Sequence, residues 1–506
     1  MIMRVVTALL LLGCCLRLGY PAALRAGTAV RGEATPGLAT ITAGDLLDDV
    51  RTLAAPAFAG RLPGTAGYDA AASWAAARFA RLGLRPGGDA GGWRQDFPTE
   101  ANVVRAASLA VVRGGRVVYD CRPGEDFVCR GFTGSGRVTA PVVFVGYGLS
   151  LPELGYDDYA GVDVAHKVVL AFKQPPGWRL SGGGWGDAHL PRPKAAVAAA
   201  HGAAALLLVS LSDSVQGGLP IGSLLEGPGP DVRVLPQLHV SVAVAESLFA
   251  GSGATQAGVR REIDTTRRPV PRALPGAVAV AVETSYTPDA PTANVVAILP
   301  GRDPALAGEA VLITAHLDHV GRQGRELLFP GANDNASGVA AVLALARAFT
   351  AEGPARRTVV FALFAGEEQG LLGARFHAAH PAVALARTVA MLNLDCVAHG
   401  DSVQLGNGRS APELWALARG MDAAGDRLSV AGTWGGGGAD ATPFHEAGVP
   451  ALYFATTRSY THLHRPSDAP ETLNGPLFEG LVRLACRVAR EVADGGYARE
   501  TVVQPR

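Results

Sequence analysis

The sequence predicts an α/β fold in which a mostly parallel mixed sheet is sandwiched by helices, with a β-rich module inserted into it. Two observations predict this fold. From residue 293 onward, short apolar and β-branched runs alternate with helical runs, which is the pattern of parallel strands joined by helices. Between residues 103 and 285, short strand-like runs alternate instead with glycine and proline turns, which indicates a separate unit.

The size and composition of the chain fit this prediction. Its 506 residues suffice for two to four domains, or for one large α/β unit with an insertion. Apolar residues make up 48% of the chain and charged residues 18%, which allows a large core and excludes a disordered chain. Lysine plus arginine and aspartate plus glutamate number 45 each, and this balance argues against a nucleic-acid or anionic-membrane partner.

The N-terminus has the pattern of an export signal. Arg4 precedes a short apolar run over residues 5–12, and this run is too short to span a bilayer. Cleavage near Ala26 would release a soluble, secreted or periplasmic protein, which is the form we favour. The segment "LLGC" is an imperfect lipobox, so a lipid anchor at Cys14 is the alternative. No later segment has the pattern of a membrane span.

The elements before residue 286 follow from their periodicity. Residues 43–83 contain two helical runs, "AGDLLDDVRTLAAPAF" and "GYDAAASWAAARFARLGL", with the loop "AGRLPGTAG" between them. The inserted module contains four predicted strands, "APVVFVGYGL", "HKVVLAFKQP", "AAALLLVS" and "QLHVSVAVA", and one predicted helix, "PKAAVAAAHGAA". We expect its histidines to be structural or surface residues; they are His166, His189, His201 and His239.

The C-terminal part alternates strands and helices. "ANVVAILPG", "EAVLITAH", "RTVVFALF" and "TVAMLNLD" predict strands, and "SGVAAVLALARAFT" and "QGLLGARFHAAH" predict helices between them. In open α/β sheets, binding and catalytic sites form at the carboxyl ends of the strands. The residues that directly follow these strands are therefore the candidates for function.

Histidines and acidic residues occupy those positions. The set comprises His316, Asp318 and His319 after one strand, Asp334 before the next helix, Glu367 and Glu368 after the following strand, Asp395 after the last, and His464 and Asp468 further on. One such residue alone would be an ordinary cap or surface group. Several at successive strand ends predict a metal site, because imidazoles and carboxylates are ligands of zinc and similar divalent ions. Two metals bridged by a carboxylate form a known hydrolytic device.

The cysteines predict no metal or redox site. The six cysteines include no CxxC motif, which argues against a zinc finger and against thiol redox chemistry. Cys121 and Cys129 are close in sequence and could pair in an oxidising compartment. We expect Cys396 and Cys486, which have apolar neighbours, to be buried thiols.

Five segments resemble, in order and spacing, the co-catalytic di-zinc aminopeptidase family, that is, the bacterial leucyl aminopeptidase and aminopeptidase Y group. They are "ITAHLDHVG", "GANDNASGVA", "FAGEEQGLLGA", "NLD" and "YFATTRSYTHLHRPSD". "AGRLPGTAG" is also similar to this family. "YDDYAGVDVAHKVVLAF" and "KAAVAAAHGAAALLLVS" resemble the protease-associated domain that is often inserted in such enzymes. The resemblance implies a zinc exopeptidase-like fold.

With this resemblance, we expect six segments along the chain. They are a signal peptide (1–26), a linker (27–40), the N-terminal part of the peptidase domain (41–102), a protease-associated domain (103–285), the catalytic di-zinc peptidase domain (286–495) and a C-terminal tail (496–506). The inserted module carries no predicted metal cluster. We expect it to restrict access or bind partners without taking part in the chemistry.

The resemblance implies a role for each metal-site residue. His316 and Asp395 would bind one zinc ion, and Glu368 and His464 would bind the other. Asp334 would bridge the two ions. His462 is the alternative to His464, which we favour because the pattern His-x-x-x-Asp links it to the aspartate at position 468.

Two further residues receive catalytic roles from the resemblance. Asp318 would orient His316, since metal-binding imidazoles usually need such a partner. Glu367 would be the general base that deprotonates the zinc-bridging water and passes the proton to the departing amine. Adjacent side chains in extended backbone point apart, so Glu368 could face a metal while Glu367 faces the water. His319 is expected to shape the edge of the site.

One position departs from the family pattern. Ala441 stands where family members usually have a histidine, in the sequence Ala439-Asp440-Ala441. His445 lies four residues later, on the same face of a predicted helix, and could replace the missing side chain. Alternatively, Tyr460 or Asp440 supplies the contact.

We therefore expect a secreted or periplasmic aminopeptidase with two zinc ions and peptide substrates. The alternatives are a carboxypeptidase or a glutaminyl cyclase on the same scaffold, or a receptor-like homologue without catalysis. The inserted module argues against a cyclase. The complete set of ligands, together with Glu367, argues against a receptor.

Overall fold

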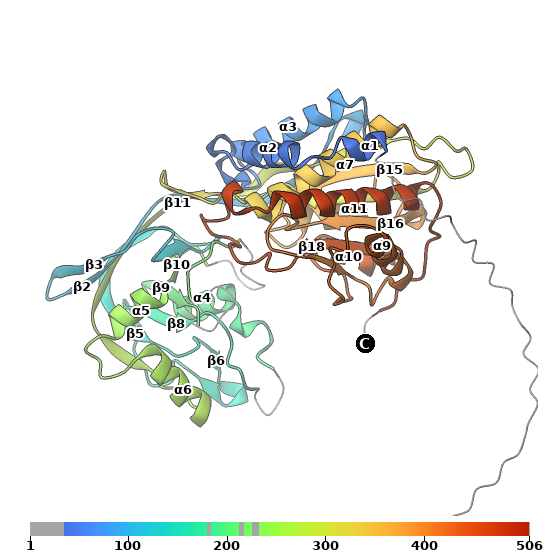
Figure 1. Cartoon of the computed structure of the whole chain (residues 1–506). Coiled ribbons are helices and arrows are strands. Elements are labelled where there is room, and N and C mark those ends of the chain that lie inside the picture. Colours follow the sequence, from blue (N-terminus) through green and yellow to red (C-terminus); the bar gives the residue numbers. More distant parts are fainter. Residues whose placement is uncertain (1–34, 180–183, 212–216, 225–231, 505–506) are drawn as a thin grey trace, which may run out of the picture.

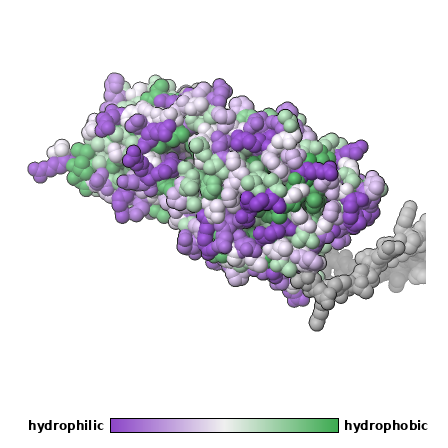
Figure 2. Space-filling model, turned by 90° about the horizontal axis from the view of Figure 1, so that it is seen from above, coloured by the Kyte–Doolittle hydropathy of each residue, from purple (hydrophilic) through white to green (hydrophobic). Residues whose placement is uncertain are grey.

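The computed structural model describes residues 35–179, 184–211, 217–224 and 232–504. The expected signal peptide lies outside the described residues, as does most of the expected linker. Residues 36–39 of that linker form a short helix, α1 (Pro36–Ala39), which packs against α7 (Gly338–Glu352). No helix in the described part of the chain is long and apolar enough to cross a membrane. The face seen in Figure 2 intermixes hydrophilic and hydrophobic side chains.

One sheet of fourteen strands extends through the molecule (Figure 1). Its C-terminal half has the order β17-β18-β16-β12-β15-β11. Its four parallel strands are β12 (Ala310–His316), β15 (Thr358–Phe364), β16 (Thr388–Leu394) and β18 (Ala451–Thr456). The edge strand β17 (Val403–Gly406) and the inner strand β11 (Arg272–Leu299) run antiparallel to their neighbours. The predicted mostly parallel mixed sheet is confirmed.

Helices cover both faces of this half of the sheet. The helices α2 (Ala43–Leu53), α3 (Ala66–Arg81), α7 and α11 (Gly475–Ala493) share one core with one set of alternating strand residues. The helices α8 (Leu372–Ala379) and α10 (Ala441–Glu446) contribute to a second core on the opposite face. Every residue of β12, β15 and β16 is buried, which explains why these strands are continuous apolar runs.

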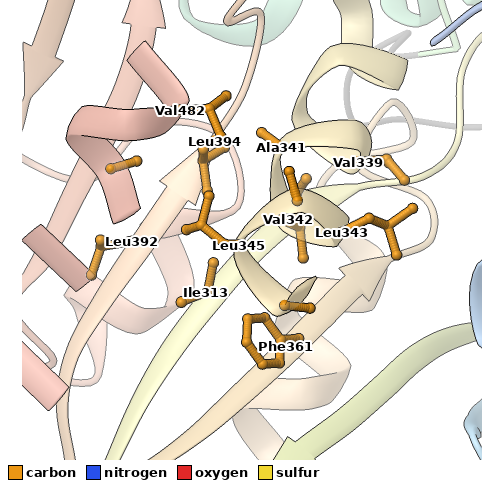
Figure 3. Close-up of a cluster of buried hydrophobic side chains, with 14 of the residues drawn as sticks. Ile313, Val339, Ala341, Val342, Leu343, Leu345, Phe361, Leu392, Leu394 and Val482 are labelled. Carbon is orange, nitrogen blue, oxygen red and sulfur yellow. The ribbon is translucent and has the colours of Figure 1, made fainter. Parts of the chain in front are cut away.

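The larger core fixes the position of α7 over the sheet. Val342 and Leu345 of α7 pack against Ile313, Phe361 and Leu392 of three adjacent strands (Figure 3). Full burial of such side chains stabilises a fold by about 1.5–3 kcal/mol each. The loop that precedes α7, which contains Asp334, is therefore attached to a rigid element.

The inserted module has its own core. Its strands are β5 (Gly136–Phe144), β8 (Val168–Phe172), β9 (Ala205–Val209), β10 (Gln237–Val240) and β4 (Phe127–Cys129), and its helices are α4 (Pro191–Ala200), α5 (Val242–Phe249) and α6 (Gln256–Thr266). The strand expected through "QLHVSVAVA" stops at Val240 and becomes α5. The reason is Ser241, whose hydroxyl oxygen accepts a hydrogen bond from the amide of Val244 and caps the helix.

Two long strands connect the module to the rest of the chain. β2 (Arg94–Arg113) pairs antiparallel with β11 along most of its length. The first half of β11 also pairs with β5 of the module, and its second half pairs with β15. Figure 1 shows both strands running between the two parts. The expected segment boundaries at residues 103 and 285 thus fall inside continuous strands.

The suggested disulfide is not formed. Cys121, Cys129, Cys396 and Cys486 are all free and buried in the structure. Burial raises the pKa of the thiols of Cys121 and Cys129 to about 12, so both remain protonated at neutral pH.

Candidate metal centre

The ends of three adjacent parallel strands meet at the site. His316 is the last residue of β12, and Asp395 directly follows β16. Glu367 and Glu368 follow β15 after a short turn. The loop before α7 adds Asp334. This is the arrangement expected for a site at the carboxyl edge of an open α/β sheet.

Asp334 lies between two histidines. Its Oδ1 atom is 3.3 Å from Nε2 of His316, and its Oδ2 atom is 3.1 Å from Nε2 of His464. Nε2 of His316 is also 3.3 Å from Oδ1 of Asp395, and Nε2 of His464 is 2.9 Å from Oε2 of Glu368. Each carboxylate oxygen of Asp334 therefore faces its own group of ligands, as a bridging carboxylate requires.

His319 joins one of these groups. Its Nδ1 atom is 2.9 Å from Oε1 of Glu368 and 3.7 Å from Oδ2 of Asp334. The side chain is fully buried, so His319 lies beneath the site and the expectation that it shapes the edge is wrong. Gly331 makes room for the ring, because a Cβ atom there would come within 2.5 Å of Cγ of His319.

The charges of the site fit divalent cations. Five buried carboxyl groups gather there together with the half-buried Glu367; the five belong to Asp318, Asp334, Glu368, Asp395 and Asp440. Burial, together with nearby Glu368 and Asp440, raises the pKa of Glu367 well above its usual value despite the opposing effect of His316. Burial likewise raises the pKa of Asp440 to about 8. Divalent cations would offset this excess of acid, and imidazole plus carboxylate is a donor set that suits zinc.

The ligand groups are compact enough to hold metal ions. The candidate ligand atoms of His319, Asp334, Glu368 and His464 lie within 4.8 Å of one another, and the same holds for His316, Asp334 and Asp395. Residues 294–489 match the model of peptidase family M28, and this match defines the M28 segment of the chain, which is less than half of its length.

Similar proteins support the assignment of the M28 segment. Aminopeptidase YwaD of Bacillus subtilis (strain 168) is 32% identical over 182 residues, which cover 33% of this chain and 37% of that protein. A probable zinc metalloprotease of Pyrenophora tritici-repentis is 54% identical over 68 residues, or 13% of this chain and 15% of that protein. The chain thus spans well under half the length of these curated relatives.

Solved structures share the fold over most of the chain. The aminopeptidase from Aneurinibacillus sp. strain AM-1 has a TM-score of 0.62 at 20% identity, and the similarity covers 94% of this chain and 98% of that chain. A peptidase M28 precursor from Shewanella amazonensis SB2B has a TM-score of 0.68 at 18% identity and covers 93% and 98% of the two chains. The similarity in fold therefore includes the inserted module as well as the M28 segment.

The two adjacent glutamates of the M28 segment lie in a turn. The backbone amide of Gly370 donates to the carbonyl of Glu367 at 2.9 Å. Oδ1 and Oδ2 of Asp318 accept hydrogen bonds of 3.2 Å from the amides of Glu367 and Glu368, respectively. The expected extended backbone at this pair is wrong. Both side chains line the same cavity because Asp318 holds the turn.

Asp318 also lies near the histidine that it was expected to orient. Its Oδ1 atom is 3.7 Å from Nδ1 of His316, whereas its own backbone oxygen is 3.3 Å from that nitrogen. The carboxylate therefore makes its hydrogen bonds to the turn of Glu367 and not to His316. This link between two strand ends is invisible in the residue pattern.

Asp468 holds the Asp334 loop and not His464. Its two carboxylate oxygens accept hydrogen bonds from the amides of Asn333 and Asp334, at 2.8 and 3.0 Å. His462 lies outside both ligand groups, with its Nδ1 atom 2.9 Å from Oγ of Ser467. The structure thus brings His464 to the metal centre, although the pattern that favoured it reflects a different contact.

Arg61 is a residue of the site that the sequence interpretation missed. It is fully buried, and its guanidinium donates to the carbonyl of Leu317 at 2.9 Å and to those of Leu53, Pro330 and Gly331 at 2.8 Å. These bonds join the loop after β12 to the loop that carries Asp334. Burial lowers its pKa to about 10, so it stays charged at neutral pH. The signal available in the sequence was a charged arginine inside the glycine- and proline-rich loop "AGRLPGTAG".

We expect replacement of this arginine to destabilise the protein. Arg61→Met leaves four buried carbonyls without their donor, and removing one partner of a buried charged network costs about 3–5 kcal/mol. The free energy of unfolding, measured by denaturant titration of the metal-free protein, should fall by about this amount. Arg81→Met, at an exposed position of α3, is the matched control and should change it by less than about 0.5 kcal/mol. If the denaturant concentration at the midpoint of unfolding were the same in Arg61→Met and wild type, Arg61 would not be a stabilising contact.

The metal centre opens into a cavity of about 810 Å³. Its walls include Leu371, Trp434, Tyr453, Tyr460 and Leu463 of the C-terminal part. From the described part of the inserted module, Ile221 and Ser223 line the cavity. The wall is therefore apolar at the sides and acidic at the base, and it is built by both parts of the chain.

The position of the missing histidine is not filled by His445. Nε2 of His445 lies 3.1 Å from Oε1 of Gln504, and His445 is not among the residues that line the cavity. Ala441 is fully buried in the apolar core around Phe364 and Phe444. The replacement hypothesis for His445 is wrong, because α10 turns this side chain toward the C-terminal segment.

Proposed function

We propose that this protein is a zinc-dependent aminopeptidase that binds two zinc ions and removes N-terminal residues from peptides. The single observation that carries the proposal is the placement of Asp334 between two groups of ligands, in a cavity that Glu367 also lines. The names of the Bacillus and Aneurinibacillus relatives support the same activity. Zinc ions in such a site supply Lewis-acid activation of water and of the scissile carbonyl group.

Each ion would have its own set of ligands. His316, Asp395 and Asp334 would hold one ion. Asp334, Glu368 and His464, from the group that also contains His319, would hold the other. Glu367 belongs to neither ligand group but lines the same cavity, and this supports its role as general base. It would take a proton from the attacking water and deliver it to the departing amine, and Glu367 would thus end the reaction in its starting protonation state.

The walls of the cavity support an N-terminal substrate with an apolar side chain. Leu371, Trp434 and Leu463 offer apolar contact, and the carboxylates at the base attract a positively charged α-amino group. Arg375 is the single lysine or arginine among the described lining residues, and its guanidinium is already paired with Glu446 at 3.2 Å. A carboxypeptidase would need a free cation there, so an aminopeptidase is favoured.

Tyr460 is the residue best placed to donate a hydrogen bond to the developing oxyanion. It lines the cavity, and although about half of the residue is exposed (52%), its partial burial together with Cys396 and Asp395 raises its pKa, so its hydroxyl remains a donor at neutral pH. We expect Tyr460→Phe to lower kcat by about 10²-fold without changing metal content, since loss of one such donor has an effect on that scale. Steady-state kinetics and elemental analysis check this. A kcat within threefold of wild type would exclude the role.

A direct test of the proposed function combines metal analysis with a substrate panel. Elemental analysis after gentle dialysis should give two zinc ions per chain. Aminoacyl p-nitroanilides should be hydrolysed, activity should disappear with a chelator and return with zinc, and N-terminally blocked peptides should resist cleavage. One ion with full activity, release of C-terminal residues, or cyclisation of N-terminal glutamine would each overturn the proposal.

We also propose that the protein is exported. The support is the charged and apolar N-terminal pattern before Ala26. Mass spectrometry of the mature N-terminus tests this proposal. A chain that starts near residue 27 would fit release, acylation at Cys14 would fit a lipid anchor, and an intact N-terminus would contradict export.

A further inference from the structure

A short segment of the inserted module is hydrogen-bonded to a candidate metal ligand. The amide of Gly222 donates to the carbonyl oxygen of His464 at 2.9 Å. In the opposite direction, Nδ1 of His464 lies 3.0 Å from the carbonyl oxygen of Gly222. The neighbouring residues Ile221 and Ser223 line the cavity of the metal centre. The module therefore meets the site at the level of a ligand.

The second of these hydrogen bonds fixes the state of the imidazole. A carbonyl oxygen only accepts, so Nδ1 of His464 must carry a hydrogen, and Nε2 is the atom whose lone pair would bind a metal ion. Nε2 is the atom that faces Asp334 and Glu368. The carbonyl of Gly222 thus plays the part that a carboxylate or backbone carbonyl usually plays behind a metal-binding histidine.

The backbone of His464 also needs support. Its φ angle is +54°, in the left-handed region, which costs a residue other than glycine about 1–2 kcal/mol. The hydrogen bond from the Gly222 amide to the His464 carbonyl holds the residue in this conformation. Asp468 does not support His464, because its carboxylate oxygens accept hydrogen bonds from the amides of Asn333 and Asp334.

The Gly222 segment is anchored in the core of the module. The amide of Ile221 donates to Nδ1 of His239 at 3.1 Å, and Nε2 of His239 lies 2.8 Å from Oγ of Ser210. His239 is fully buried in β10. Because its Nδ1 accepts, its Nε2 carries the hydrogen and donates to Ser210, so the pair is a structural anchor and not an activated nucleophile.

The opposite side of the segment is equally restrained. A Cβ atom at Gly222 would lie 3.1 Å from Cε1 of Phe329 and 3.1 Å from Cγ2 of Val320. These two residues belong to a small apolar cluster that also contains Leu224 of the same segment and Val128 of the module. The position of the Gly222 carbonyl is therefore set by groups from both parts of the chain.

We propose that the inserted module is a structural part of the metal centre, in which Gly222 orients His464 and His239 is the positioning residue that holds Gly222 in place. This inference rests on the proposed zinc function and goes beyond it, because it assigns to the module a role in the affinity for one of the two ions. This role would add to the expectations that His239 is a structural residue and that the module restricts access or binds partners without taking part in the chemistry.

The central test is the affinity for each ion in variants of the anchor. His239→Leu removes the acceptor of the Ile221 amide. We expect the affinity for the ion at the Asp334–Glu368–His464 group to fall about 10-fold, the lower end of the effect of losing such a partner, while the other ion stays bound. Equilibration in zinc buffers followed by elemental analysis measures both affinities. The visible spectrum of the cobalt-substituted protein reports the geometry of the altered ion.

Companion variants separate orientation from general damage. His239→Asn places an amide oxygen where Nδ1 accepts, and it should restore an affinity close to wild type. Gly222→Pro removes the amide hydrogen that reaches His464 and should weaken the same ion selectively; its ring also crowds Phe329 and Val320, and Gly222→Ala, which adds the crowding Cβ but keeps the amide hydrogen, separates the two effects. Leu219→Ser, at an exposed position of the same segment, is the matched control and should leave both affinities unchanged. If His239→Leu does not fold, Gly222→Pro and His239→Asn still decide the question.

The possible results distinguish this inference from the proposed function. Wild-type protein that binds fewer than two zinc ions overturns the proposed function. Two ions in wild type, with unchanged affinities in both His239→Leu and Gly222→Pro, overturn this inference alone. Equal weakening of both ions in these variants, without rescue by His239→Asn, would mean that the segment merely stabilises the fold, and the positioning role would be rejected.

Discussion

Replacing Glu367 with glutamine is expected to lower kcat by at least about 10²-fold while both zinc ions stay bound, which is the scale of general-base catalysis. The amide cannot accept a proton from water at neutral pH, but it occupies nearly the same volume as the carboxyl group. Glu367 belongs to neither group of ligand atoms, so its loss should leave the metal content intact. Turnover of an aminoacyl p-nitroanilide and elemental analysis of the same sample give the two readouts.

The neighbouring glutamate provides the matched control. Oε2 of Glu368 lies 2.9 Å from Nε2 of His464, so Glu368→Gln should lower the occupancy of one ion. Glu367→Gln and Glu368→Gln are identical chemical changes at adjacent positions. If Glu367→Gln loses a zinc ion and Glu368→Gln keeps both, the roles of the two glutamates must be exchanged.

Replacing Asp334 with asparagine is expected to weaken both zinc ions and to reduce activity by about 10³-fold or more. The two oxygens of Asp334 face His316 and His464 separately, so one substitution disturbs both ligand groups. Lewis-acid stabilisation is worth several kcal/mol, and each 1.4 kcal/mol corresponds to about tenfold in rate. Zinc stoichiometry across a series of zinc buffers, measured beside kcat, checks the prediction.

An exposed aspartate serves as the control for this change. Asp163→Asn in the inserted module, where the side chain pairs with Lys167 at the surface, should keep two ions and wild-type turnover. If Asp334→Asn retained one ion at full affinity, Asp334 would be a ligand of the other ion alone. The bridging role would then be excluded.

The core strands of the M28 segment were predictable because burial on both faces leaves a clear pattern. β12, β15 and β16 are continuous apolar runs, and their observed bounds agree closely with those expected from the sequence. The long strand β11 was not predictable as one element. Its middle contains Pro288 and Pro291, which indicate a turn, and the register with β2 shifts between Thr287 and Ala290 without ending the pairing.

The candidate ligands were visible because metal chemistry demands particular residue types at strand ends. The contacts that hold them were not visible. Gly222 supports His464 through its carbonyl, and every residue has a carbonyl, so no side-chain pattern marks it. The contacts of Arg61 were hidden in the same way, because its four partners are also backbone carbonyl oxygens. The burial of His319 depends on the space left by Gly331, which appears only in three dimensions.

The two strands that join the module to the M28 segment suggest how the module could have been inserted and why it would be hard to lose. β2 leaves the host fold and β11 returns to it side by side, so the module enters and exits through a single antiparallel ribbon. Such a connection lets an insertion be gained without rearranging the host, because the two chain ends that it joins are already neighbours. In topology the module is dispensable, since a hairpin between β2 and β11 would close the host. Because the carbonyl behind His464 comes from Gly222, a chain shortened in this way would have to find that partner elsewhere, which makes the addition hard to reverse.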